Sequence, residues 1–448
     1  MASDPVPELL QRAATRLAKE FAALPDVPLA GDLARMEAVL ERIAARLGDN
    51  YPYFHPLYAG QMLKPPHPVA RTAYALAMAI NPNNHARDGG RASSEMEIEA
   101  VRGIAGMFGW TEYLGHLTSG GTMANLEALW VAGQLVPGKR IVGSEQAHYT
   151  HGRISGVLKL EYSPIQVDAA GRMDIAALED ELKKGDVGTI VVTLGTTAIG
   201  AVDPLDEILV LRQRYGFRIH VDAAYGGYFR LIKDQLGDSA RRAFAAMEQA
   251  DSIVIDPHKH GLQPYGCGCV LFRDPGVGLF YKHDSPYTYF TSCELHLGEI
   301  SLECSRAGAA AVALWATMQL LPLTTDGEFA RGLAAGRCAA VELDRRFRAD
   351  GRFKAPAAGG PELDIVVSVV RGGSAQESSA RAQAIFDACA RRNLHLALVQ
   401  LPVRWFGAWD TPEIVTCLRS VLMKPEHEAW LDRIWSELDA ASAEILKS

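Results

Sequence analysis

A lysine between two histidines follows an apolar run that has the composition of a buried strand. Residues 252–255 read Ser-Ile-Val-Ile and residues 256–261 read Asp-Pro-His-Lys-His-Gly, which places Lys259 just beyond the end of the strand. Open α/β sheets bind ligands at this edge. A lysine held there beside other cations and partly desolvated loses its proton more readily and can act as a nucleophile. The alternative is a solvated loop lysine, and this segment alone does not decide between the two.

An acidic residue ends a second apolar run, at residues 218–221. Asp222 is followed by Ala-Ala-Tyr-Gly-Gly, and small residues such as Ala224 leave room for a flat ligand over the backbone. The carboxylate can hold a cationic ring nitrogen. It can equally cap the turn that follows the strand.

Glycines precede the helical pattern of residues 123–134. Residues 115–122 read Gly-His-Leu-Thr-Ser-Gly-Gly-Thr. Glycines let backbone N–H groups converge, a helix N-terminus favours an anion, and the Thr122 hydroxyl can add a hydrogen bond. The segment lacks the Gly-Lys-Ser/Thr ending of a Walker loop, and a tight turn is the alternative. Together with Asp222 and Lys259, it supplies in chain order a phosphate site, an acid for a ring nitrogen and a nucleophilic amine.

These segments resemble the group II pyridoxal-phosphate-dependent decarboxylases, which have the aspartate-aminotransferase fold, fold type I. The resemblance covers roughly residues 54–322 and is most specific in residues 118–122, 220–225 and 256–259. Residues 147–149, 195–197 and 302–306 add to it. The resemblance implies pyridoxal 5′-phosphate as the cofactor, bound on a mostly parallel α/β sheet with a small α+β domain beside it.

The resemblance gives each matching residue a role. It implies that Lys259 bonds to the cofactor, that Asp222 partners the ring nitrogen and that His148 stacks on the ring. The other cofactor contacts that it implies are Ala224 on the opposite ring face, Thr197, and the phosphate ligands Gly120, Gly121, Thr122 and His258. Many relatives have asparagine where this chain has Asp256, and a carboxylate there repels a phosphate unless it is turned away or hydrogen-bonded.

A proton donor is also implied, because a proton must return to the substrate after carbon dioxide leaves. The family has a loop tyrosine in this region, and the candidates are Tyr287, which is favoured, and Tyr289; His148 is a further candidate. The alternative for both tyrosines is packing at a subunit interface.

The remaining candidates are substrate contacts. They are His55 and His85, in segments similar to the substrate side of the family, and Arg306, which can reach a carboxylate or phosphate or can pair with Glu303. His151 can lie near the ring, but a position on the helix surface is favoured.

Cys267 and Cys269 are the two cysteines that lie closest together in the sequence, and they fall at the predicted strand 268–272. No second pair of cysteines or histidines stands at metal-ligand spacing from them. We therefore expect both thiols in the core and no metal site.

The elements that must position these residues alternate between short β-rich runs and helical patterns. Strands are expected at residues 141–143, 165–167, 189–194, 218–221, 252–255 and 268–272, and helices at 123–134, 175–183, 205–215 and 241–249. This alternation indicates a largely parallel sheet covered on both faces. A capping box at residues 94–97 predicts the start of another helix. We expect a helical arm at residues 1–54, a large cofactor domain at 55–322 and a small α+β domain at 323–448.

Composition and charge exclude several classes of protein. The 448 residues are 48% hydrophobic and 22% charged, as in globular proteins, and the net charge of −8 argues against nucleic acid and anionic membranes as partners. The apolar stretch 307–323 contains Thr317, Gln319 and Pro322, which favours a buried helix over a membrane span. The N-terminus does not resemble a secretory signal, and seven scattered cysteines fit reduced thiols, so we expect a cytoplasmic protein.

The expected reaction is decarboxylation of an L-amino acid to an amine and carbon dioxide. Aromatic residues near positions 51–55 and 287–290 favour an aromatic substrate, such as tyrosine, phenylalanine, tryptophan or a hydroxylated form. The alternatives are an acidic amino acid, an aldehyde synthase, a phosphosphingoid-type carbon–carbon lyase and an inactive scaffold, the last disfavoured by the intact Lys259 and Asp222. The resemblance and two unpartnered N-terminal helices indicate a homodimer with its active site at the interface.

Overall fold

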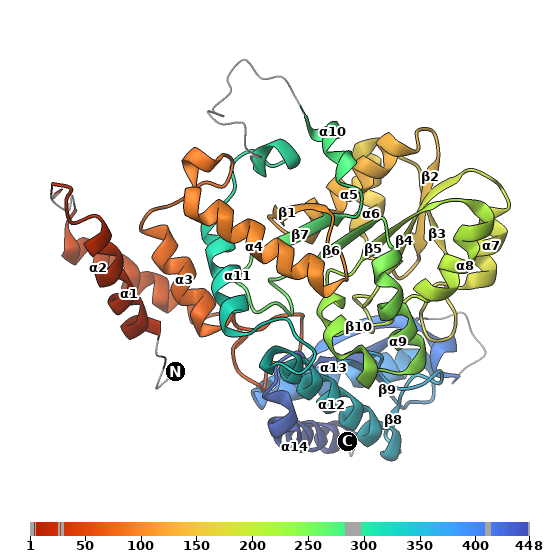
Figure 1. Ribbon diagram of the computed structural model, residues 1–448. Helices are drawn as coiled ribbons and strands as arrows, with labels where there is room; N and C mark the ends of the chain where they lie inside the picture. The colour runs from red at the N-terminus through yellow and green to blue at the C-terminus, as the bar shows by residue number, and fades with distance from the viewer. Residues whose placement is uncertain are drawn as a thin grey trace.

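A seven-stranded, mostly parallel sheet forms the centre of the protein (Figure 1). The computed structural model describes residues 4, 6–25, 27, 31–282, 297–407 and 414–446. The strand order is β1-β7-β6-β5-β4-β2-β3, with β7 antiparallel to both of its neighbours and parallel pairing from β6 to β3. The strands are β1 (Leu114–Thr118), β2 (Arg140–Ser144), β3 (Tyr162–Ile165), β4 (Val187–Thr193), β5 (Arg218–Asp222), β6 (Ser252–Ile255) and β7 (Gly268–Phe272). The predicted fold class is thus confirmed.

Helices cover both faces of this sheet, which is why its inner strands are almost continuously apolar. In β6, Val254 packs against α5 (Gly121–Leu135), whereas Ile253 and Ile255 belong to the core on the other face. The other helices around the sheet are α4 (Arg91–Met107), α6 (Thr150–Leu158), α7 (Ile175–Leu182), α8 (Leu205–Tyr215), α9 (Asp238–Ala245) and α11 (Gly308–Leu320). The apolar stretch tested as a membrane span is α11, and no described helix is long and apolar enough to cross a membrane.

Three local predictions were wrong. The third strand of the sheet is Tyr162–Ile165 rather than residues 165–167. The predicted capping box does not cap a helix, because α4 begins at Arg91 and both Ser94 and Glu97 are buried within it. Strand β1 was not predicted, since it is short and contains Gly115 and His116, neither of which favours a strand.

A second, antiparallel sheet of order β10-β11-β9-β8 builds the smaller C-terminal unit. Its strands are β8 (Phe353–Lys354), β9 (Ile365–Val370), β10 (Ala397–Pro402) and β11 (Ile414–Val421), packed with α12 (Glu328–Ala349), α13 (Ala375–Arg391) and α14 (His427–Leu446). A segment from near the N-terminus joins this unit: the Ala59 N–H donates to the carbonyl of His395, and Ala59 lies in its hydrophobic core.

The N-terminal arm consists of α1 (Val6–Glu20) and α2 (Leu33–Leu47), which project from the body beside α3 (Pro68–Met78) (Figure 1). Neither α1 nor α2 contains a buried residue. An apolar row along α2 is exposed, made up of Leu33, Met36, Leu40, Ile43 and Leu47. Helices that leave such a row uncovered need a further surface to pack against.

Candidate active site

A cavity of about 320 Å³ lies at the carboxyl ends of β4, β5 and β6. This is the edge at which the sequence placed its chemistry. The structure brings all nine predicted cofactor contacts to its wall: Gly120, Gly121, Thr122, His148, Thr197, Asp222, Ala224, His258 and Lys259. Met123, Asn125, Thr150, Thr193, Gly195, Tyr225 and Asp256 complete most of the lining.

The carboxylate of Asp222 is buried at the end of β5 and is held by three donors. Its Oδ2 accepts from His151 Nε2 at 2.8 Å and from Asn125 Nδ2 at 3.4 Å, and its Oδ1 accepts from the Ala224 N–H at 3.1 Å. Burial on its own would raise the pKa of Asp222, but the hydrogen bond from His151 and the charges of His151 and Lys259 hold that pKa well below its usual range. The site therefore presents a permanent negative charge in a largely dry setting.

The predicted position of His151 on the helix surface is wrong. It is fully buried and positions Asp222. Asn125 has a similar task, since its Oδ1 accepts from His220 Nε2 at 2.8 Å while its amide faces Asp222. Burial lowers the pKa of His220 to about 3, so that ring is a neutral part of the support. His148 precedes α6, whereas His151 lies in its first turn, so no helical spacing in the sequence signalled that His151 contacts Asp222.

Lys259 lies at the opposite wall, and its ammonium is paired within the chain. Its Nζ is 3.2 Å from Asp256 Oδ2, and His258 Nε2 is 3.6 Å from the same oxygen. His258 is oriented by the hydrogen bond from its Nδ1 to the carbonyl of Cys267 at 2.8 Å. Burial lowers the pKa of His258, partly offset by the charge of Asp256. Asp256 is thus neither solvated nor turned out of the cavity, but held by Lys259.

The glycine segment forms a narrow cradle between β1 and α5. A Cβ on Gly121 would lie 2.6 Å from Asp256 Oδ2, and a Cβ on Gly268 would lie 2.6 Å from the backbone carbon of Gly120. Only glycine permits these approaches. Helix α5 begins in this cradle, at the cavity wall. Its first N–H groups lack partners within the helix, so hydrogen bonding and the helix dipole both favour a phosphate there. The cradle, the ionised Asp222 and the amine of Lys259 fit a phosphorylated cofactor that has a cationic ring nitrogen.

His148 stands between these two walls. Its Nδ1 lies 2.8 Å from the Thr150 hydroxyl, which fixes the orientation of the ring. Burial lowers the pKa of His148, so the neutral ring prevails near pH 7. A neutral, flat imidazole suits stacking on a cofactor ring.

The three predicted substrate contacts do not line this cavity. His55 packs edge-on against Trp430, with ring centroids 4.9 Å apart, on the small C-terminal unit. His85 Nδ1 lies 3.5 Å from the Sγ of Cys304. Arg306 is buried in an ion pair with Glu97 rather than with Glu303. Tyr287 and Tyr289 lie outside the described residues.

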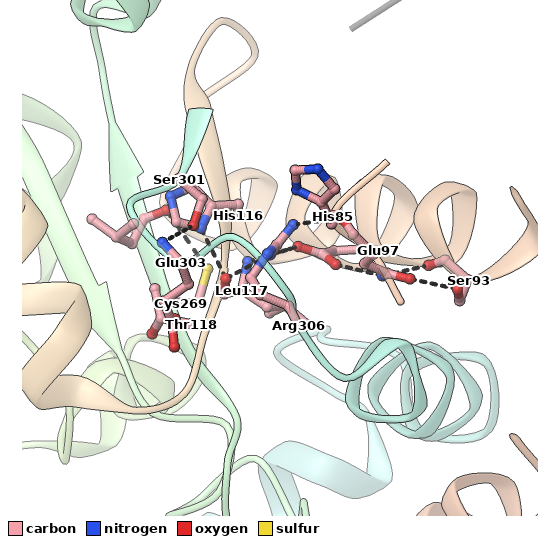
Figure 2. A network of polar contacts seen from close by, with 12 residues as sticks. His85, Ser93, Glu97, His116, Leu117, Thr118, Cys269, Ser301, Glu303 and Arg306 are labelled. Carbon is pink, nitrogen blue, oxygen red and sulfur yellow. Dashed lines mark hydrogen bonds and ion pairs between the residues drawn. The ribbon is translucent and has the colours of Figure 1, made fainter. Parts of the chain in front are cut away.

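Figure 2 shows how Glu97 and Arg306 hold the strand that leads into the cradle. Arg306 Nη1 donates to Glu97 Oε1 at 2.6 Å and to the Leu117 carbonyl at 2.8 Å, and the Leu117 N–H donates to Glu97 Oε1 at 3.0 Å. The Asn84 amide donates to Glu97 Oε2 at 2.6 Å. Because β1 is an edge strand, these side chains satisfy backbone groups that a neighbouring strand would otherwise pair. Just beyond, Glu303 accepts from the Ser119 N–H at 2.9 Å.

The two cysteines near the lysine are part of the core, as predicted. Cys267 and Cys269 are buried, and burial raises the pKa of both thiols. Within the described ranges, no three histidine, cysteine or acidic side chains come together in a way that could hold a metal ion.

Comparison with known proteins gives a consistent result. A model of the pyridoxal-dependent decarboxylase conserved domain matches residues 130–360. L-tyrosine decarboxylase of Enterococcus faecium is 29% identical over 413 residues, covering 70% of this chain and 67% of that protein. A probable L-tyrosine/L-aspartate decarboxylase of Methanothrix thermoacetophila is 32% identical over 269 residues, covering 58% and 65%. The chain spans about two thirds of the length of such curated relatives.

Solved structures share the fold over nearly the whole chain. Oryza sativa TDC with PLP and tryptamine has a TM-score of 0.79 at 17% identity, covering 99% of this chain and 98% of that one. Mouse CSAD in apo form has a TM-score of 0.78 at 20% identity, covering 98% and 96%. Both similarities concern the fold.

Proposed function

The chain belongs to the family of pyridoxal-dependent decarboxylases, and from this premise we propose that it converts an aromatic L-amino acid to its amine and carbon dioxide. The observation that carries the proposal is the cavity, in which Lys259, the ionised Asp222 and the glycine cradle face one another. The relatives named L-tyrosine decarboxylase support the aromatic class. An acidic substrate is the second candidate, because other relatives are named for both tyrosine and aspartate.

The residues divide the work of holding the cofactor. Lys259 supplies the amine for a covalent bond, the start of α5 and His258 receive the phosphate, and Asp222 faces the ring nitrogen. Pyridoxal phosphate, when bound, accepts the electrons that remain at Cα when the carboxyl group leaves. Asp222 keeps the ring nitrogen protonated, and His151 and Asn125 keep Asp222 ionised and aligned.

Return of a proton to Cα is assigned to a loop tyrosine rather than to His148. A lowered pKa makes the His148 ring a weak source of protons at neutral pH, whereas a tyrosine hydroxyl carries its proton there. Tyr287 is the first candidate and Tyr289 the second. The variants Tyr287→Phe and Tyr289→Phe separate them, because loss of the donor lowers amine formation and favours oxidised products.

The exposed row of α2 and the arm that carries it support a homodimer. We propose that a second copy covers these side chains, and that residues from the partner complete the substrate side of each cavity. His55 and His85 do not line the cavity of their own chain, so substrate contacts from these two segments would have to reach the partner's site. Arg306 is committed to Glu97 and β1 in its own chain. Light scattering of the purified protein should give the mass of two chains, and a fully active single chain would contradict the proposal.

The test of the function is a substrate panel with the cofactor-loaded protein. The twenty common amino acids and dihydroxyphenylalanine are assayed for amine, carbon dioxide and hydrogen peroxide. Amine and carbon dioxide from an aromatic amino acid are expected, and Lys259→Ala should abolish turnover together with the visible absorption of covalently bound cofactor. Peroxide in proportion to turnover would indicate an aldehyde synthase, and unchanged turnover in Lys259→Ala would refute the assignment.

A further inference from the structure

A second cavity, of about 490 Å³, lies against the residues that follow Lys259 in the chain. His260 and Leu262 form one wall. The other walls come from residues 64–68, the first turns of α12 and residues 424–426, just before α14. The loops that follow β6 and β11, the start of α12 and the segment that follows the N-terminal arm therefore meet here. The proposed function uses none of these side chains.

Two lysines are placed at this cavity without an acidic partner. Lys424 is 2% exposed, and its Nζ donates to the carbonyls of Tyr58 at 2.6 Å and Leu63 at 3.3 Å. The Nζ of Lys64 donates to the carbonyl of Met423 at 3.3 Å. Among the described residues, no carboxylate lies within ion-pair distance of either ammonium. The Nζ of Lys424 also lies 5.2 Å from the centre of the Tyr58 ring. Carbonyl dipoles and a ring face stabilise a cation only partly, so neither the buried Lys424 nor the half-buried Lys64 has a full counter-charge.

The surroundings add positive rather than negative charge. Arg419 is 4% exposed and also donates only to backbone carbonyls, including that of Gly60. The one buried carboxylate in this neighbourhood of described residues is Asp364, which accepts from the Tyr225 hydroxyl at 2.5 Å and lies 3.4 Å from His260 Nε2. Two buried cations, Lys424 and Arg419, and the half-buried Lys64 thus stand against one buried acid.

The rim of the cavity is mixed in charge. It carries His67 and Arg331 as basic groups and Glu328 and Glu426 as acids, of which the arginine and both glutamates are exposed. Exposed charges are screened by solvent and salt. Glu426 raises the pKa of both lysines, but as an exposed, screened charge it offsets theirs only in part.

We propose that this second cavity is a binding site for a small oxyanion, a phosphate or a carboxylate, which is held by the ammonium groups of Lys64 and Lys424. Such a ligand supplies the negative charge that the surrounding chain lacks, and a cavity of this size accommodates it together with its water. The site is separate from the phosphate cradle of Gly121, which belongs to the first cavity.

The protonation of the lysines sets a pH dependence for the site. Burial lowers the pKa of Lys64 to about 8 and that of Lys424 to about 7. His260 is also buried, and burial lowers its pKa, so it stays neutral. Both lysines carry more charge as the pH falls through these values. Anion binding should therefore strengthen from pH 9 to pH 6.5, and a bound anion should take up protons with it.

The experiment uses the cofactor-loaded protein, so that the first cavity is occupied, at constant ionic strength with chloride as the reference anion. Inorganic phosphate and acetate are titrated separately by calorimetry, which distinguishes the two sources of the oxyanion. Binding to the wild type at pH 6.5 is expected, weaker by about tenfold in Lys64→Gln and in Lys424→Met. Lys183→Met is the matched control, because Lys183 is an exposed lysine paired with Asp180.

Either of two results would overturn the inference. One is that neither phosphate nor acetate binds more tightly than chloride; the other is that both lysine variants bind as the wild type does. Lys64→Gln removes a single hydrogen bond and should fold even if Lys424→Met does not. The visible absorption of the cofactor reports separately on the proposed function, since its retention shows that the first cavity is intact.

Discussion

The ion pair of Glu97 and Arg306 offers a quantitative test of how the cradle is held in place. Glu97 is 2% exposed and accepts hydrogen bonds from Arg306, from the Leu117 N–H and from Asn84. Removing one partner of a buried pair leaves an uncompensated charge and costs about 3–5 kcal/mol. The Glu97→Met substitution leaves both the guanidinium of Arg306 and the Leu117 N–H without the carboxylate that they bind. We therefore expect local opening of β1 to become easier by about 3 kcal/mol, or roughly 100-fold.

Amide hydrogen exchange measures this opening without requiring the whole protein to unfold in one step. The peptide that spans residues 114–121 should exchange about 100-fold faster in Glu97→Met. The cofactor should also dissociate faster, because this strand leads directly into Gly121. Glu20→Met is the matched control: its partner is Arg16 on the exposed helix α1, with both side chains more than half exposed. Exposed pairs contribute about 0–1 kcal/mol, so little change is expected.

The double variant Glu97→Met/Arg306→Met separates charge from position. With both charges removed, the loss should be smaller than the sum of the two single losses by about 2 kcal/mol or more. Additive single effects, or unchanged exchange of the 114–121 peptide in Glu97→Met, would refute the claim that these side chains hold the edge strand.

Two further predictions concern the first cavity. Gly121→Ala should weaken cofactor binding by about tenfold or more, because the new Cβ would lie 2.6 Å from Asp256 Oδ2. Equilibrium titration of the cofactor measures this change. The control is Gly106→Ala, whose new Cβ meets nothing within 4 Å and which should bind the cofactor normally. His151→Phe removes the hydrogen bond that opposes the effect of burial on Asp222, so the pKa of Asp222 should rise. The cofactor affinity of the His151→Phe variant should then fall as the pH is lowered from 8 to 6. The affinity of the wild type should stay constant over this range, apart from the titration of the cofactor itself. Parallel pH profiles of affinity for the variant and the wild type would count against this role of His151.

Much of the site was predictable because its residues form short local patterns. Lys259, Asp222 and Gly121 each stand directly after a strand or before a helix, and the carboxyl ends of parallel strands necessarily meet at one edge. The sequence therefore located these residues even though they are far apart in the chain. The inner strands β4, β5 and β6 were predictable for a related reason, since burial on both faces makes them continuously apolar, whereas the edge strand β1 was missed.

The supporting residues were not predictable in the same way. His151 and Asn125 lie on helices, and no local pattern states that both turn toward Asp222. The spacing of Ser94 and Glu97 predicted a capping box at the start of a helix. The carboxylate of Glu97 instead pairs with Arg306, which is distant in sequence. A polar side chain whose partner arrives from another element carries no signature in its own segment.

The two cavities differ in how their cations are balanced, and this difference follows from the chain itself. The ammonium of Lys259 has a carboxylate 3.2 Å away, so the first cavity contains its own counter-charge before any cofactor arrives. Asp256 Oδ2, which supplies that counter-charge, also lies 3.6 Å from His258 Nε2. Lys64 and Lys424 have carbonyl oxygens as hydrogen-bond acceptors, and Lys424 also has the face of the Tyr58 ring, but neither has a carboxylate at ion-pair distance among the described residues. The chain has more acidic than basic residues, with a net charge of −8. Even so, none of the described carboxylates lies at ion-pair distance from these two ammonium groups. This is the arrangement expected where the anion comes from outside the chain.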